Sequence, residues 1–167
     1  QQEVQPTEVT VTPVVEEVVA TPEPVVPERY AVSSSPHGAV SVDTINLALG
    51  VYQDMGMTKQ GAGYLVGNFI AESKMVPCGL YGDGGLAQGL GQWHPSRRQD
   101  MPCDLVEQLK WAVNTEMVRD YGGHKLKAWL FDPSASADTI SLGLKQWERY
   151  GLEGNRRLYG DKIFNQL

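Results

Sequence analysis

From Val42 onward, apolar residues recur at the three- and four-residue steps that are typical of an amphipathic helix. The first such set is Ile45, Ala48, Leu49, Tyr52 and Met55. Asp43 is a suitable N-cap and Gly56 is a suitable end, so the pattern predicts a first helix between these two residues.

The next segment, KQGAGYLVGNFIAESKM, carries an apolar stripe of Leu65, Val66, Phe69 and Ile70. Thr58 can cap it and Pro77 prevents its continuation, so a second helix is predicted between them. Glycines in a helix interior cost about 1 kcal/mol each relative to alanine, and this segment contains Gly61, Gly63 and Gly67. Such a cost is acceptable where neighbouring helices approach closely, which predicts that this helix is central and buried.

The later part of the chain predicts further helices. Asp104 and Glu107 resemble a capping box at the start of a helix that is expected to end at Gly122-Gly123. The remaining helices are expected from Leu126 to Phe131, from Asp138 to Gly151 and from Arg156 to Phe164. Residues 78–103 contain six glycines, which favours a loop or a small β-hairpin. The fold class expected is therefore α+β and mainly α, with about six helices around one glycine-rich β-hairpin.

Residues 1–38 have a different character, since Val, Pro, Glu and Thr dominate them and no helical period is present. They are interpreted as an extended tether in front of a domain of residues 39–167. The Val and Thr clusters favour β structure, so the tether is expected to lie along another subunit by strand addition.

The charge is unevenly distributed between these two parts. Six of the 20 acidic residues lie within residues 1–28, which contain no Lys or Arg, so the remaining 14 acids balance the 14 bases of residues 29–167. A neutral domain lacks the main driving force for sequence-independent nucleic-acid binding, and no nucleic-acid partner is expected. No apolar run reaches the roughly 18 residues of a membrane-spanning helix.

Cys78 and Cys103 are too few for a disulfide framework and lack metal-ligand partners at the usual spacing. The sequence leaves two free thiols and one disulfide equally open. No metal and no cofactor is expected.

Glu72 is the first candidate for chemistry. It follows Phe69 by three residues, which places it on the apolar stripe, and it lies in the last turn of its helix, where the helix dipole disfavours a carboxylate. Both positions raise the expected pKa of Glu72, and a protonated carboxyl group can donate to a glycosidic oxygen. A surface position, or an ion pair with Lys74, Arg97 or Arg98, is the structural alternative.

The surroundings of Glu72 favour the chemical reading. The chain contains LVGNFIAES, then the glycine-rich stretch and GLGQWHPSRR, and later QLKW and WERYG with Arg156 downstream. This order of motifs resembles the phage tail lysozyme family, a virion-associated branch of the lysozyme-like superfamily. The Glu-Ser and Gly-x-x-Gln elements also resemble lytic transglycosylases.

The resemblance implies a lysozyme-like fold and a role for several residues. Glu72 would be the general acid, Ser73 would orient it and Gln92 would line the cleft. Asp83 could act as a second carboxylate or simply form a turn, and the substrate's N-acetyl group can assist if Asp83 does not act. Substrate contacts are expected from Tyr81, Gln88, Trp93 and Arg97, although Trp93 fits the core equally well. Glu148 is expected in a structural ion pair with Arg149, Arg156 or Arg157.

The function that the resemblance implies is cleavage of peptidoglycan glycan strands by a virion-associated tail enzyme, bound to other tail subunits through residues 1–38. A muramidase and a lytic transglycosylase, which leaves 1,6-anhydro ends, both stay open. A non-catalytic structural virion module is the alternative outside enzymology. A peptidase that uses Cys78 with His94 or His124 is a weaker alternative, because Cys78 is expected after a helix end rather than at a helix N-terminus.

Overall fold

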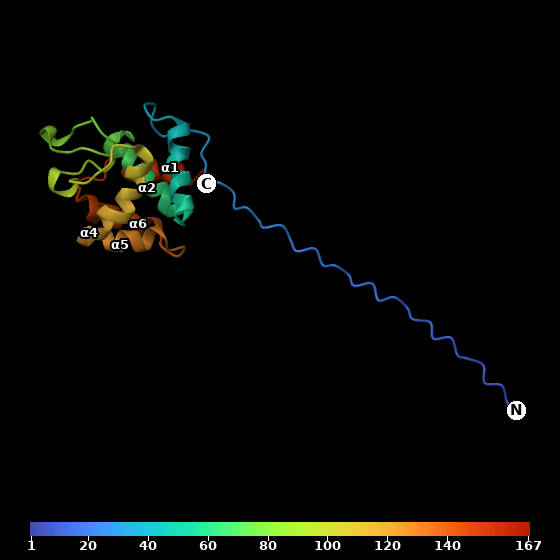
Figure 1. The fold of residues 1–167 in the computed structure, drawn as a ribbon. Helices are drawn as coiled ribbons and strands as arrows, with labels where there is room; N and C mark the ends of the chain where they lie inside the picture. The colour runs from blue at the N-terminus through green and yellow to red at the C-terminus, as the bar shows by residue number, and fades with distance from the viewer.

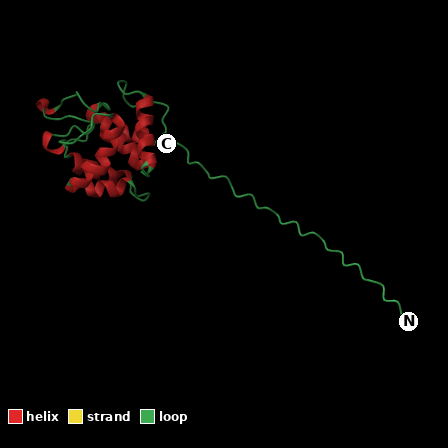
Figure 2. Ribbon diagram, in the orientation of Figure 1, coloured by secondary structure: helices red, strands yellow, loops and turns green.

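The computed structural model describes residues 1–167 and shows helices and loops without a β-strand (Figures 1 and 2). The helical segments are α1 Val42–Asp54, α2 Lys59–Ser73, α3 Leu105–Trp111, α4 Met117–Arg119, α5 Tyr121–Leu130, α6 Ala137–Glu148 and α7 Arg156–Phe164. A π-helical turn, Ala112–Glu116, joins α3 to α4. The expectation of a mainly helical fold is confirmed.

Helix α2 is the centre of the domain, as its glycines predicted. Thr58 caps it by accepting a hydrogen bond from the Gly61 amide. A Cβ atom on Gly67 would collide with the backbone of Gly160 in α7, and one on Gly61 would collide with the carbonyl of Leu130 at the end of α5. The glycines therefore let the backbones of neighbouring helices touch α2 directly, which offsets their low helix propensity.

A methyl group at this contact tests the close packing. We expect Gly67→Ala to lower the free energy of unfolding by about 1–3 kcal/mol, since α7 has to move away from α2. Gly38→Ala is the control, because Gly38 is exposed and its added Cβ meets no atom within 4 Å. Thermal unfolding of both variants measures the difference, and an unchanged melting temperature for Gly67→Ala would contradict the described contact.

Several helix ends differ from the predicted ones. Ser41, rather than Asp43, caps α1. The glycines expected to end the third helix instead begin α5, because the Asp120 carboxylate accepts hydrogen bonds from the amides of Gly122 at 3.0 Å and Gly123 at 3.1 Å.

The two ends of α6 also shift relative to the prediction. Ser136, rather than Asp138, provides the N-cap. The helix ends at Arg149, which adopts the left-handed conformation with φ of 57°, before Gly151 is reached.

The glycine-rich segment does not form the predicted β-hairpin. It contains two isolated antiparallel bridges, Gly82 with Ala87 and Gln88 with Trp93. Between the bridging residues the chain turns through left-handed conformations, which lie outside the extended region that a strand needs. The residues with positive φ here are Asp83, Gly84, Gly85, Gly89 and Gln92.

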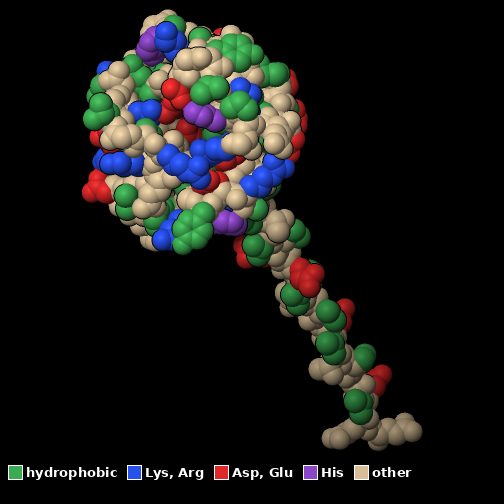
Figure 3. All heavy atoms as spheres, turned by 90° about the vertical axis from the view of Figure 1, so that its left-hand side faces the viewer, with side chains coloured by type: hydrophobic (Ala, Val, Ile, Leu, Met, Phe, Trp, Pro, Cys, Tyr) green, Lys and Arg blue, Asp and Glu red, His purple; other side chains and the backbone are tan.

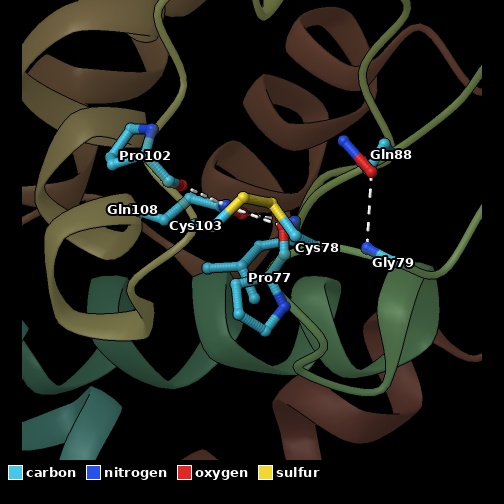
Figure 4. The surroundings of a disulfide bond; sticks show 8 residues. Pro77, Cys78, Gly79, Gln88, Pro102, Cys103 and Gln108 are labelled. Atoms are coloured by element: carbon cyan, nitrogen blue, oxygen red, sulfur yellow. Dashed lines mark hydrogen bonds between the residues drawn. A yellow bond between two sulfur atoms is a disulfide. The ribbon is translucent and has the colours of Figure 1, made fainter.

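A disulfide joins Cys78 to Cys103 and closes this loop at its base (Figure 4). Beside it, the buried Gln108 amide nitrogen donates to the carbonyls of Pro77 at 2.8 Å and Pro102 at 2.7 Å, and its oxygen accepts from the Leu90 amide at 2.7 Å. The base of the loop is thus fixed by the disulfide and by the three hydrogen bonds of the Gln108 side-chain amide. The residues between the cysteines are therefore held against the helices.

Loss of this bridge has a calculable effect. The cysteines are 25 positions apart, and closure of such a loop contributes about 3 kcal/mol in the chain-entropy treatment. We expect the double variant Cys78→Ser, Cys103→Ser to unfold at correspondingly lower denaturant concentration. Equilibrium unfolding with and without a reducing agent measures it, and equal stability of oxidised and reduced protein would contradict the expectation.

Residues 1–27 are exposed, form neither helix nor strand and extend away from the domain (Figure 1). The chain then contacts the helices: the carbonyl of Glu28 accepts a hydrogen bond from Gln53, Val32 is buried, and the Ser33 amide donates to Gln166. The contacts therefore begin at Glu28, eleven residues before the predicted domain start at residue 39. The function of the extended part as a tether stays a prediction. None of the helices has the length and hydropathy required to cross a membrane.

Candidate functional site

A cleft with a volume of about 650 Å³ lies where the glycine-rich loop faces the C-terminal ends of α2 and α6. Figure 3 views the molecule from the loop side, where acidic, basic and histidine side chains gather around a recess. The lining residues are Glu72 from α2, Asp83, Ala87, Gly91, Gln92, Trp93, His94, Ser96 and Arg97 from the loop, and Glu148, Arg149, Tyr150 and Arg156 from the region between α6 and α7. Its volume falls within the range of small-molecule binding sites.

Glu72 lies at this cleft in the last turn of α2, and its side chain is 13% exposed. Its Oε1 accepts hydrogen bonds from Arg156, at 2.8 Å from Nε and 2.5 Å from Nη2. Burial raises the pKa of Glu72 above its usual value, and the Arg156 guanidinium acts in the opposite direction without cancelling the shift. The ion-pair partner of Glu72 is therefore Arg156 of α7. It is none of the three residues considered from the sequence, Lys74, Arg97 and Arg98.

Arg156 is itself held in place. Its guanidinium carbon lies 3.9 Å from the centre of the Tyr150 ring, a cation–π contact. Its Nη1 donates to the carbonyls of Leu152 at 3.0 Å and Glu153 at 3.1 Å. Burial raises the pKa of Tyr150 to about 12, so its ring stays neutral beside the guanidinium at physiological pH.

Glu148 is the second glutamate of the cleft, and the predicted ion pair for it is wrong. Its Oε1 is buried and has no hydrogen-bond partner. Each expected arginine pairs with another carboxylate: Arg149 with Asp120, Arg156 with Glu72, and Arg157 with Asp138 and Asp161. Burial raises the pKa of Glu148 well above its usual value, and the nearby charge of Glu72 raises it further.

Arg97 forms a buried ion pair beneath the cleft. Its Nε donates to Glu116 at 2.8 Å and its Nη2 donates to the Trp147 carbonyl at 3.1 Å. The Trp147 indole N–H donates to the other Glu116 oxygen. The guanidinium expected to bind substrate thus connects the loop to α6 and the π-helical turn.

Trp93 belongs to the core, with only 1% of its surface exposed. Its ring makes edge-to-face contacts with Phe69, Trp111 and Trp147 at centroid distances of 6.1, 5.1 and 5.7 Å. A sugar has no access to the faces of this ring, so the structure places Trp93 as the anchor of the loop. Its indole nitrogen is buried and has no partner.

Three further predicted residues lie at or beside the cleft. Asp83 Oδ2 lies 2.6 Å from His94 Nε2 at the exposed rim. The Gln92 amide nitrogen donates to the carbonyls of Leu80 and Gly89 and so shapes the loop. The Ser73 hydroxyl donates to the Phe69 carbonyl at 3.0 Å and makes no hydrogen bond to Glu72.

Two predicted substrate contacts lie outside the cleft lining. Tyr81 is 59% exposed on the loop, and the Gln88 oxygen accepts a hydrogen bond from the Gly79 amide at 3.3 Å. The disulfide removes the free thiol of Cys78, so the cysteine nucleophile alternative is wrong. Within residues 1–167, no group of three His, Cys, Asp or Glu side chains could hold a metal ion.

Two partly buried glutamates, Glu72 and Glu148, line one open cleft, and carboxyl groups are the side chains that glycoside cleavage uses. Comparison with known families gives one similarity: the model of the phage tail lysozyme family matches residues 48–119, somewhat less than half of the chain. The match confirms the resemblance inferred from the sequence motifs and suggests a peptidoglycan-lytic enzyme. It covers Glu72 and the loop, and ends before α5. No curated protein and no solved structure shows significant similarity to the chain.

Proposed function

We propose that this protein cleaves the β-1,4 bond between N-acetylmuramic acid and N-acetylglucosamine in peptidoglycan, with Glu72 as the general acid. The observation that carries the proposal is the position of Glu72 in an open cleft of about 650 Å³. Burial raises the pKa of Glu72, which favours the protonated form that a general acid needs. The family match adds support from a separate source.

In this mechanism, Glu72 gives its proton to the glycosidic oxygen as the bond to the anomeric carbon breaks. The leaving sugar then departs as a neutral alcohol, and positive charge develops at the anomeric carbon. Arg156 competes for the Glu72 carboxylate, so displacement of this contact by substrate would make the acid more effective.

The surroundings of Asp83 favour a structural role for this residue over a catalytic one. It is paired with His94 at the exposed rim and adopts φ of 51° in a turn. We therefore propose that the N-acetyl group of the substrate assists the departure, an arrangement used by some single-acid glycosidases.

The attacking group distinguishes the two enzymatic alternatives. Water gives a muramidase, which we favour, and the 6-hydroxyl of the muramyl residue gives a lytic transglycosylase. Mass spectrometry of digested, purified peptidoglycan decides between them: reducing ends show hydrolysis and 1,6-anhydro ends show transglycosylation. The absence of both products would contradict the enzymatic proposal.

A purely structural virion module is less well supported, because Glu72 and Gln92 line one open cleft rather than a closed interior. We propose that the enzyme is carried by the tail of a virion and acts on the wall of the host. The exposed, extended residues 1–27 are suited to strand addition to another tail subunit.

A further inference from the structure

Three arginines line the cleft, Arg97, Arg149 and Arg156, and they differ in how far the protein already uses them. The Arg156 guanidinium donates from all three of its nitrogens, to Glu72 and to two backbone carbonyls. Arg97 is only 17% exposed and donates from two nitrogens to partners beneath the cleft. Both side chains are therefore committed to contacts within the protein.

Arg149 is the arginine that stays open to the cleft. Its side chain is 60% exposed, and its one side-chain hydrogen bond runs from Nη2 to the Asp120 carboxylate. A guanidinium presents five N–H groups in a planar fork, so most of those on Arg149 are free to bind a ligand. Figure 3 shows basic side chains (blue) beside the recess on this face of the molecule.

The position of this guanidinium is fixed from the protein side. Asp120 is only 7% exposed, and its second oxygen accepts hydrogen bonds from the amides of Gly122 and Gly123 at the start of α5. The backbone of Arg149 ends α6 in the left-handed conformation, with its amide donating to the Lys145 carbonyl at 2.8 Å. Arg149 is thus held at both ends, which lowers the entropy lost when a ligand orders it.

A held guanidinium with free N–H groups is suited to a carboxylate, which it binds through paired, charge-assisted hydrogen bonds. The formal charges at this wall balance, because Glu116 and Asp120 offset Arg97 and Arg149. Attraction therefore depends on directed hydrogen bonds at short range rather than on net charge. The carboxylate that fits is one carried by a substrate whose sugar rings already lie in the cleft.

We propose that Arg149 binds a carboxylate on the muramyl side chain of the substrate and makes the cleft selective for glycan strands that carry this charge. This inference rests on the proposed function, since it concerns the same cleft and the same glycan. N-acetylglucosamine has no carboxyl group. Each muramyl residue carries a lactyl group that ends either in a free carboxylate or in a peptide stem with carboxylates of its own.

Neutralising the carboxyl groups of the substrate tests the proposal. Coupling of soluble, uncross-linked peptidoglycan to methylamine with a carbodiimide converts its carboxylates to neutral amides and leaves the glycan bonds intact. For wild type, we expect KM to be about 10-fold higher on the amidated strands, the loss that follows removal of one charge-assisted hydrogen bond. Arg149→Gln should show this higher KM on both substrates, with kcat nearly unchanged, because it removes binding that ground state and transition state share.

Two further variants serve as controls. Arg149→Lys keeps the charge without the planar fork and should recover only part of the affinity for untreated strands. Arg119→Gln is the matched control, since Arg119 is 56% exposed, pairs with Asp100 and lies outside the cleft lining. It should have the wild-type KM on both substrates.

The source of the carboxylate is determined with strands from which an amidase has removed the peptide stems. A KM effect of Arg149→Gln that persists on these strands assigns the lactyl carboxylate, and an effect that disappears assigns the stem. Either result supports the proposed binding of a muramyl carboxylate.

The outcomes separate the two proposals. Wild-type protein that releases no glycan fragments overturns the proposed function, and this inference with it. Fragment release by wild type with equal KM on untreated and amidated strands overturns only the role of Arg149. The same holds if Arg149→Gln raises KM by an equal factor on both substrates, which is the result expected of a purely structural arginine.

Discussion

Glu72→Gln is expected to lower kcat for glycan cleavage by about 10²–10⁴-fold, the range in which a general acid contributes. Glutamine occupies the same place in the cleft but has no proton to donate at the scissile bond. Its amide oxygen can still accept a hydrogen bond from Arg156, so we expect the melting temperature to change by no more than about 2–4 °C. The measurement is the rate of fragment release from purified peptidoglycan.

The control for this variant is Glu107→Gln, an exposed carboxyl group outside the cleft, which should retain full activity. Wild-type rates in a folded Glu72→Gln protein would show that the acid is another residue.

Glu116→Ala is expected to have the largest effect on stability. It leaves the Arg97 guanidinium, with 17% of its side chain exposed, without its charge partner and removes the acceptor of the Trp147 indole. Removal of one partner from a buried ion pair costs about 3–5 kcal/mol. Denaturant unfolding measures this loss.

Glu107→Ala is the matched control, since it makes the same substitution at an exposed site on α3. A similar, small change in both variants would show that the Arg97–Glu116 pair contributes little. A large loss in Glu116→Ala alone would support its function as the connection between the loop and α6.

The helices were predictable wherever their signals are local. Thr58 and Asp104 have the cap positions expected from the sequence, with hydrogen bonds to the Gly61 and Glu107 amides. The end of the third helix could not be predicted in this way, because Gly122 and Gly123 are suited both to the end of one helix and to the first turn of the next. The Asp120 side chain decides between them by capping α5.

The site was predictable only in part, since it depends on contacts between distant segments. Glu72 could be singled out from its position on the apolar stripe, but its partner Arg156 lies 84 positions away. What brings them together is the contact of Gly67 with Gly160 between α2 and α7. No local pattern identifies Gly160 as the partner of Gly67.

The same limit applies to Glu148 and Trp93. Several arginines follow Glu148 in the sequence, which favoured an ion pair between Glu148 and one of them. In the structure each of these arginines pairs with another carboxylate. Trp93 lies next to Gln92 in the loop, and only the contacts with Trp111 and Trp147 show that its ring faces the core.

A pH titration of the glutamate side chains, followed by the ¹³C shifts of labelled carboxyl groups, tests the central claim most directly. The signals of Glu72 and Glu148 are identified by their loss in Glu72→Gln and Glu148→Gln. The account predicts that both titrate above the ordinary glutamate pKa of about 4.3, with Glu148 the higher of the two. If both titrate at or below that value, the cleft holds no proton donor at neutral pH and the proposed chemistry is contradicted.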